Sequence, residues 1–342
     1  MFKYVLKRVF LLIPTLLIVL TAVFCLARMV PGSPVYSLLE DEDYTAEMVE
    51  DLKEEMGFND PIIVQWARYI KDIFTGNWGN SYFNDTPVFK NMIAVWEPTL
   101  LITFYATFIT VLIAVPLGIF TATHRNSPMD YLVTTLSTAT MVVPGFCVGL
   151  LFCYFFGYKL GWFPTVGYVP IAKGGIWQSL RNVTMPSVAL GLSHVASLTR
   201  FTRSSMLDVL NQDYIRTARA KGLRLSQVYY KHALKNTLPI VGTMIVGSFA
   251  GMLGGASVTE KVFNIQGMGT LMVSSLSRRD YPQEQAIVVF VALVSLGVDL
   301  LMDIMYKAPS DETLKTCRIT EDVVKGTGEP VCEHAEPDSE SA

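Results

Sequence analysis

The sequence predicts an all-α integral membrane protein that crosses the bilayer six times. Of its 342 residues, 51% are hydrophobic, and the mean hydropathy is +0.37, which is more apolar than an ordinary soluble domain of this size. The apolar residues gather in six blocks, each near the roughly 20 residues that a helix needs to cross a bilayer. Because a single segment in lipid can satisfy its backbone polar groups only as a helix, we expect all six blocks to be helical.

The six blocks define the spans and the segments between them. They lie near residues 9–30, 98–122, 131–157, 184–201, 238–258 and 285–306. The first block follows a basic start, but it is longer than the core of a signal peptide and no small-residue cleavage site follows it. We therefore predict that residues 1–30 form an N-terminal segment with a retained first span. Four prolines lie in or at the edge of these blocks: Pro14, Pro116, Pro144 and Pro239. Each is expected to kink its helix, either beside a cavity or with no role beyond packing.

The charges of the connecting loops predict the orientation. Residues 31–97 hold thirteen acidic residues against four Lys and Arg, whereas the connection between spans 4 and 5 holds eight Lys and Arg against two acids. Short loops rich in Lys and Arg stay in the cytoplasm. The N- and C-termini and the connection between spans 4 and 5 are therefore predicted to be cytoplasmic. The connection between spans 3 and 4 conflicts mildly with this orientation, because Lys159, Lys173 and Arg181 would face outside.

Residues 31–97 are predicted to fold as a small extracytoplasmic cap. Met48–Met56 reads as an acidic amphipathic helix, and Ile62–Phe74 has apolar residues at helical spacing. A turn cluster follows at Gly76–Gly79. The core permease domain would then occupy residues 98–306. The acidic remainder, 307–342, has few large apolar residues and is predicted to be a mobile cytoplasmic tail.

No motif in the chain predicts catalysis. The sequence has no G-x-x-x-x-G-K-[S/T] loop for ATP, no H-E-x-x-H and no G-x-S-x-G. We therefore predict no catalytic, cofactor-binding or metal-ligating residue. Two polar residues within the spans, His194 and Asp299, are candidates for a transport pathway. An ionisable group at membrane depth is energetically costly, so its presence there indicates a function. Equally, the histidine can be a packed side chain, and Asp299, with Asp303, can reach water near the end of span 6.

The connection at residues 201–238 is the most informative segment. It is long and basic, and Gly222 separates a short helix at Tyr214–Lys221 from a second helix that starts near Ser226. A solvated loop whose charges only fix the topology would need no such structure. The pattern therefore favours a docking element.

Several stretches resemble the oligopeptide/dipeptide branch of binding-protein-dependent ABC importer permeases. The cytoplasmic loop of that family is similar to residues 198–210, 213–223 and 232–239. The resemblance continues at 76–88, 254–269 and 279–282, and the opening at 7–34 is similar to the B-type subunit rather than its C-type partner. Together these stretches extend over residues 1–306.

The resemblance implies a type I ABC importer permease (MetI-like) fold and a role in coupling for the loop after span 4, the EAA loop of the family. Its short helix would sit in a groove of a separate ATPase. Arg216-Thr217-Ala218 stands where Glu-Ala-Ala is usual, as is common in the peptide branch. The coupling role would fall on Asp213, Tyr214, Ile215, Arg216, Thr217, Ala218, Arg219, Ala220, Lys221 and Gly222.

The resemblance also implies the partners and the location. The partners would be a second homologous permease subunit, two cytoplasmic ATPases that bind ATP and Mg, and an extracytoplasmic peptide-binding protein, with no nucleic acid. The location would be the prokaryotic plasma (inner) membrane, which the chain crosses several times.

The implied function is to form half of a translocation pathway for peptides. The same machinery could instead import nickel, glutathione or an oligosaccharide. Two other classes remain. An ATP-independent carrier would show inverted repeats and charges near the midplane, and an intramembrane enzyme would need a nucleophile or metal pair within the spans.

Overall fold

The computed structural model describes residues 2–29, 34–39 and 45–324, and within them all regular structure is helical apart from one isolated bridge between Asn80 and Pro87. In chain order the elements are α1 (Phe2–Met29), α2 (Pro34–Leu38), α3 (Ala46–Glu55), α4 (Ile62–Phe74), α5 (Val88–Thr123), α6 (Pro128–Val142), α7 (Gly145–Phe152), the π-helix η1 (Cys153–Lys159), α8 (Ile171–Leu210), α9 (Asp213–Ala220), α10 (Leu225–Gln227), the π-helix η2 (Val228–Ala233), α11 (Leu234–Val262), α12 (Met268–Arg278) and α13 (Tyr281–Val324).

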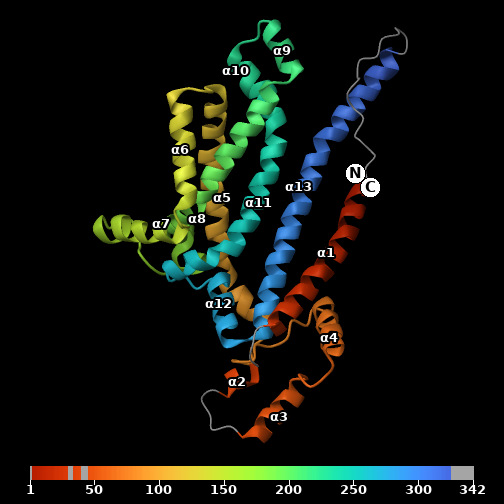
Figure 1. Cartoon of the computed structure of the whole chain (residues 1–342), viewed down its shortest axis with the longest axis vertical. Coiled ribbons are helices and arrows are strands. Elements are labelled where there is room, and N and C mark those ends of the chain that lie inside the picture. Colours follow the sequence, from red (N-terminus) through yellow and green to blue (C-terminus); the bar gives the residue numbers. More distant parts are fainter. Residues whose placement is uncertain (1, 30–33, 40–44, 325–342) are drawn as a thin grey trace.

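The long helices form an elongated bundle with a small group of short helices at each end (Figure 1). One end carries α9 and α10 and is called the α9 end below. The opposite end, called the cap end, carries α2, α3 and α4. Helices α5 and α8 make the most extensive pair in the bundle, and α1 packs along α13 as an outer pair.

Within the part of the chain that the structure describes, four helices are long and apolar enough to cross a membrane by themselves. They are Phe10–Met29, Val88–Thr123, Leu225–Val262 and Tyr281–Met302. The predicted span at 184–201 lies inside α8, which is kinked at Gly175 (φ +74°) and is less apolar than these four helices. Some of its polar side chains are enclosed by protein: Ser187 is fully buried and donates to the carbonyl of Ile102 on α5 at 3.1 Å.

Small residues bring α8 against α5. A Cβ atom added at Gly191 would lie 2.9 Å from the hydroxyl of Thr110, and one added at Gly118 would lie 2.6 Å from Cβ of Thr202. Both distances are shorter than side chains tolerate, so glycine is required for this approach. Helix α8 therefore fills the middle of the bundle rather than facing lipid on all sides.

The predicted third span at 131–157 is bent within the block, at the place where the sequence analysis expects a kink at Pro144. The chain breaks after α6, and residues 145–159 continue at 95° to it. Val143 takes an extended conformation (φ −81°, ψ 120°) immediately before Pro144, as the proline ring favours for the preceding residue. Helix α7 consequently projects sideways from the bundle (Figure 1).

The cap contains both helices that the periodicity predicts, as α3 and α4, and the turn cluster between them and α5 uses left-handed glycines at Gly76 and Gly79. Two segments far apart in the sequence hold the cap to the bundle. The carboxylate of Asp280, which is 4% exposed, accepts from the hydroxyl of Ser81 and from the amide of Tyr82. The turn cluster is therefore fixed to the start of α13.

At its other end α13 extends past the predicted limit of span 6 near residue 306, as far as Val324. The remainder of the predicted acidic tail, 325–342, lies outside the described residues, as do residues 30–33, on which part of the resemblance to the B-type subunit rests. The mobility of the tail stays a prediction.

Candidate functional site: the surface of helix α9

Helix α9 forms at the position that the sequence predicts, with firm signals at both ends. Asp213 lies in its first turn, where an acid is favoured by the helix dipole. Gly222 follows the helix with φ +75°. The amide of Gly222 donates to Arg219 O at 3.0 Å and that of Leu223 to Ala218 O at 3.4 Å. These bonds make a Schellman motif, in which glycine at the left-handed position ends the helix.

One face of α9 is anchored in the bundle. Ile215 is fully buried and Ala218 is 8% exposed, and because they are three residues apart they point the same way. They belong to one cluster of buried residues, called the α9 cluster here, that joins the ends of four elements: Ile119, Ala122, Met206, Val209, Ile215, Ala218, Val228 and Ala233. Helix α9 therefore shares a core with α5, α8 and η2.

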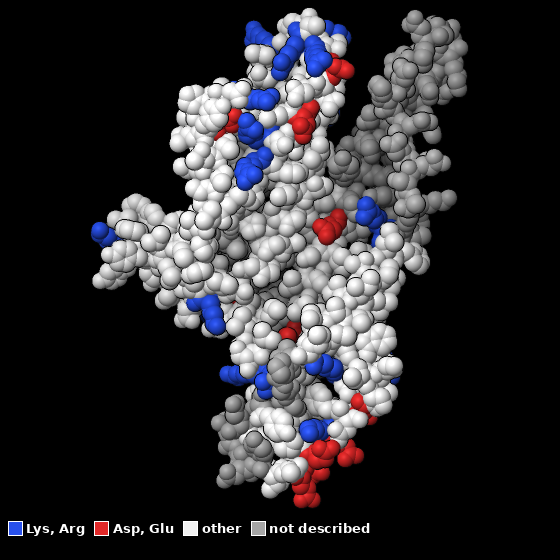
Figure 2. Space-filling view, viewed as in Figure 1, with Lys and Arg blue, Asp and Glu red and all other residues white. Residues whose placement is uncertain are grey.

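The other face of α9 is exposed and basic. Arg216, Arg219 and Lys221 all face outward. Arg216 lies 3.4 Å from Asp213, but both side chains are largely exposed, so this pair contributes little to stability. Figure 2 shows basic side chains gathered over the α9 end and acidic ones at the far tip of the cap. The exposed basic face is free to meet a partner of opposite charge.

The second helix of the loop begins at Leu225, close to the predicted start near Ser226, and it continues into α11. Residues from Leu225 onward run through α10 and η2 directly into α11, as one stretch from Leu225 to Val262. Val228 and Ala233 of this stretch lie in the α9 cluster. A displacement of α9 would therefore act on α11 without an intervening flexible linker.

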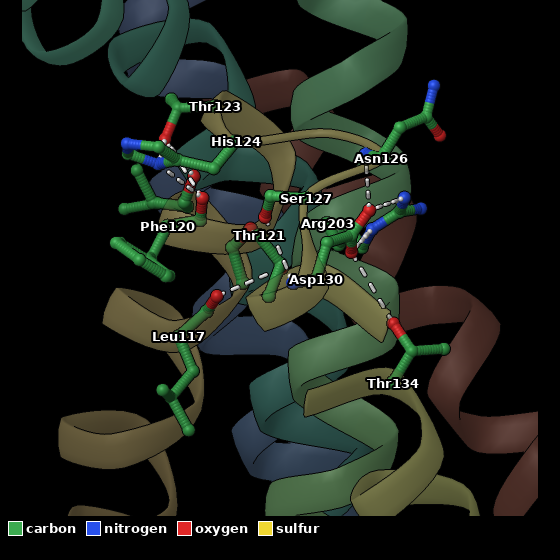
Figure 3. Close-up of polar contacts among 12 residues, drawn as sticks. Leu117, Phe120, Thr121, Thr123, His124, Asn126, Ser127, Asp130, Thr134 and Arg203 are labelled. Carbon is green, nitrogen blue, oxygen red and sulfur yellow. Dashed lines mark hydrogen bonds and ion pairs between the residues drawn. The ribbon is translucent and has the colours of Figure 1, made fainter. Parts of the chain in front are cut away.

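An ion pair beneath the α9 end joins α6 to α8 (Figure 3). Arg203 donates from Nε and Nη2 to the two carboxylate oxygens of Asp130, each at 2.8 Å. The Asp130 side chain is 4% exposed and that of Arg203 26%. Such a two-bond fork fixes orientation as well as distance, so the start of α6 is locked to α8 close to the α9 cluster.

The same aspartate also organises the start of α6. Ser127 caps the helix by accepting from the amide of Asp130 at 3.2 Å, and Asp130 accepts from the amide of Asn126 at 3.0 Å. In the sequence, Arg203 counts among the basic residues that predict the topology and lies in the stretch 198–210 that resembles the family's loop, and nothing there points to Asp130. The run Ser127-Pro128-Met129-Asp130 carries a helix-start signal, but nothing in it reveals a partner 73 positions away.

Replacing Asp130 by alanine is expected to lower the free energy of unfolding by about 2 kcal/mol, because the half-buried Arg203 loses its partner. Thermal unfolding of the purified chain would measure this. Arg200→Ala is a matched control, since Arg200 lies one turn away, is exposed and forms no ion pair among the described residues. Equal unfolding temperatures for the two variants would contradict the prediction.

The predicted pathway residues are not brought into one site. His194 lies in α8, half-buried, with Nδ1 3.2 Å from the carbonyl oxygen of Leu190 in the same helix. A Cβ added at Gly251 would lie 3.8 Å from its Nε2, so the imidazole faces α11. Asp299 is exposed on α13. Their role in a pathway stays a prediction.

A buried carboxylate lies where α11 meets α5 and α12, and the sequence analysis assigns it no role of its own. Glu260 on α11 is fully buried, and it accepts from the hydroxyl of Thr99 at 2.5 Å and the amide of Thr270 at 2.8 Å. The same hydroxyl accepts from the amide of Met268 at 2.8 Å. One side chain therefore ties α5, α11 and α12 together.

Comparison with known proteins identifies the class of protein. Residues 114–310 match the family described as binding-protein-dependent transport system inner membrane component, and residues 1–103 match its N-terminal part. The glutathione transport system permease protein GsiC of Salmonella paratyphi A is 39% identical over 308 residues, 90% of this chain and 97% of that protein. GsiC of Escherichia coli K12 is 37% identical over the same lengths.

A solved structure confirms the predicted fold. A chain of the MetNI methionine ABC transporter in an inward-facing conformation superposes with a TM-score of 0.53, over 65% of this chain and 97% of that one. The two chains are only 15% identical, so this likeness concerns the fold alone. The family match covers more than half of the sequence. The chain therefore belongs to the family of binding-protein-dependent transport system inner membrane components, as a membrane-spanning permease subunit of an ABC importer that is not itself an enzyme.

Proposed function

We propose that the exposed face of α9 is the surface through which separate ATPase subunits drive this permease, as part of the coupling loop at 201–238. The observation that carries the proposal is the position of α9: a basic face open to a partner, on a helix whose other face shares a buried core with α5, α8 and η2. A push on α9 would reach three long helices at once, because packed side chains move together rather than deforming independently.

Cysteine crosslinking tests this coupling role. In a chain whose five native cysteines are replaced, single cysteines at Thr217 and Lys221 lie on the exposed face, whereas one at Ala218 lies in the α9 cluster. Crosslinks to co-expressed ATPase that change with nucleotide are expected at the two exposed positions and not at Ala218. If neither exposed position crosslinks in a complex that still transports, the loop is only a topological tether.

The distribution of charge between the two ends of the molecule also supports an orientation in the membrane. We propose that the α9 end and both termini are cytoplasmic and that the cap, at 31–97, is outside, since the basic residues gather at the first and the acids at the tip of the second. The acidic helix α3 would then offer a landing surface to an extracytoplasmic binding protein. Charge reversal at Glu47, Glu50 and Glu54 that leaves uptake unchanged would contradict that part.

The working assembly would hold this chain, a second homologous permease, two ATPases that bind ATP and Mg, and the binding protein. ATP binding would close the ATPases, α9 would move with them, and the pathway between the permeases would open outward. His194 and Asp299 are proposed to face that pathway. Uptake that is unchanged in His194→Asn and Asp299→Asn would remove them from it.

For the substrate we propose small peptides, with glutathione, a tripeptide, included. Support comes from GsiC, whose name assigns it to glutathione transport and which aligns with 90% of this chain. Competition by unlabelled glutathione and by dipeptides against a labelled tripeptide, in membranes with the full importer, separates these from nickel and oligosaccharides. Competition by nickel or an oligosaccharide alone would overturn the peptide assignment.

A further inference from the structure

Arg200 on α8 is an exposed arginine that no acid of the described chain neutralises. Its guanidinium contacts the thioether of Met141 on α6, with Nη1 3.4 Å from Sδ. Arg203, one turn further along the same helix, is held by two bonds to Asp130. Of these two neighbouring arginines, one is a structural partner and the other is available to a ligand.

The Arg200 side chain points away from the nearest membrane surface. Arg203 meets Asp130 at the start of α6, beside the predicted cytoplasmic loop, and long basic side chains near a span end normally reach toward that surface. Arg200 instead reaches Met141, which lies eleven residues after Asp130 and so about 16 Å further along α6. That distance is about half of the hydrocarbon thickness of a bilayer. A lone cation at this depth is costly unless it faces water or an anion.

The face of α8 that carries Arg200 is polar. Ser193, Ser197 and Ser204 lie on the same face at spacings of three and four residues, and none of these side chains is buried. The opposite face, at Gly191, packs closely on α5. Figure 2 shows basic side chains reaching from the α9 end part of the way down the bundle. Helix α8 therefore has one face that packs and one polar face that is open.

Helix α5 exposes a face of the opposite kind. Phe104, Phe108 and Leu112 follow one another at a spacing of four residues, and they are 61%, 61% and 62% exposed. Lipid chains can cover such an apolar face, but they offer no partner to a guanidinium or to serine hydroxyls. The contrast indicates that the polar face of α8 borders a water-filled space rather than lipid.

The chemistry of this face specifies its ligand. A guanidinium presents a planar fork of donors that fits a carboxylate or a phosphate. Lipid phosphates lie at the membrane surfaces, about half a hydrocarbon core away from the Arg200 guanidinium. A carboxylate that travels through the protein is therefore the group that this arginine can meet. Every peptide with an unmodified end carries one, at its C-terminus.

We propose that the polar face of α8 lines the translocation pathway and that Arg200 binds the C-terminal carboxylate of the peptide in transit. The hydroxyls of Ser193, Ser197 and Ser204 offer hydrogen bonds to the rest of the peptide. This inference rests on the proposed function, because it assigns a chemical group of the proposed substrate to a residue of the chain.

Uptake of two peptides separates this role from a structural one. Vesicles hold the whole importer with ATP inside, and the binding protein is supplied saturated with labelled trialanine or with its C-terminal amide, which has no carboxylate. Arg200→Gln is expected to lower trialanine uptake about tenfold, as loss of a charged hydrogen bond should, while amide uptake stays the same. Arg200→Lys should keep part of the trialanine uptake, because it retains the charge without the fork.

Arg181→Gln is the matched control for this measurement. It removes an exposed arginine near the other end of the same helix, and uptake of both peptides should be unchanged. If the wild type imports neither peptide, the proposed function fails and the carboxylate assignment fails with it. If the wild type imports trialanine, the role of Arg200 alone is overturned by an Arg200→Gln variant that imports trialanine equally well, or that loses both peptides to the same extent.

Thiol labelling tests the open face without transport. In the chain whose native cysteines are replaced, Arg200→Cys is compared with Leu112→Cys, which lies on the apolar exposed face of α5 at a similar distance from the α9 end. The anionic reagent 2-sulfonatoethyl methanethiosulfonate, applied to both sides of the membrane, should label Arg200→Cys at least about tenfold faster, because the reactive thiolate forms in water. Equal rates would place Arg200 against lipid and would overturn the proposal.

Discussion

Replacing Ile215 by aspartate is expected to reduce uptake by at least about tenfold, because it places an unpaired carboxylate in a site with no access to water. Ile215 is fully buried in the α9 cluster. Undocking α9 costs less than burying that charge, so the helix is expected to leave the α9 cluster. Uptake and ATP hydrolysis would both be measured in vesicles that hold the whole importer. In this variant ATP hydrolysis is expected to continue while uptake is lost.

Trypsin cleavage shows whether the cause is undocking. Arg216 and Arg219 become more accessible once α9 leaves the bundle, so cleavage after them should be faster in Ile215→Asp. Thr217→Asp is the control for cleavage after Arg219, since it adds the same charge to the exposed face of the same helix and should not speed that cleavage. Cleavage after Arg216 is not compared in this variant, because an acid directly after an arginine itself slows trypsin. Wild-type uptake by Ile215→Asp would mean that a docked α9 is not needed for coupling.

Replacing Glu260 by alanine is expected to lower the free energy of unfolding by about 3 kcal/mol or more. The change leaves the Thr99 hydroxyl and the Thr270 amide without their acceptor, and each unpaired buried donor costs about 1–3 kcal/mol. A cavity adds to the loss, because Glu260 is fully buried. Thermal unfolding in detergent measures the effect.

The free energy of unfolding of Glu260→Gln should lie between that of the wild type and that of Glu260→Ala. Its amide oxygen still accepts from Thr99, but its amide nitrogen would face the donor of Thr270. Glu55→Ala provides a control, since it removes an exposed glutamate on α3. A Glu260→Ala chain as stable as Glu55→Ala would show that the contacts of Glu260 do not hold α5, α11 and α12 together.

Local pattern was enough to predict the helices. Apolar blocks located α1, α5, α11 and α13, amphipathic spacing located α3 and α4, and Gly222 correctly ended α9. Each of these signals is contained within a few turns of the chain. Pro144 is also a local signal for a break. A block of apolar residues does not indicate the angle between the two helical parts, however, so the 95° bend could not be predicted from it.

The polar contacts could not be predicted, because both partners of each lie far apart in the sequence. Asp130 meets Arg203 across 73 positions, and Thr99 meets Glu260 across 161. Which helices are neighbours decides these pairs, and a single sequence does not contain that information. Conversely, the charge of the 201–238 loop was evident, yet only the burial of Ile215 and Ala218 shows which face of α9 is available to a partner.

The polar character of α8 has a consequence for how the protein is made. A helix that is not apolar enough to partition into lipid by itself must enter the bilayer against a helix already there. Its serine and glycine contacts are with α5, which is made earlier and is strongly apolar. We therefore expect α8 to insert against α5, so that changes at Gly118 or Gly191 that push these helices apart would lower the amount of chain inserted.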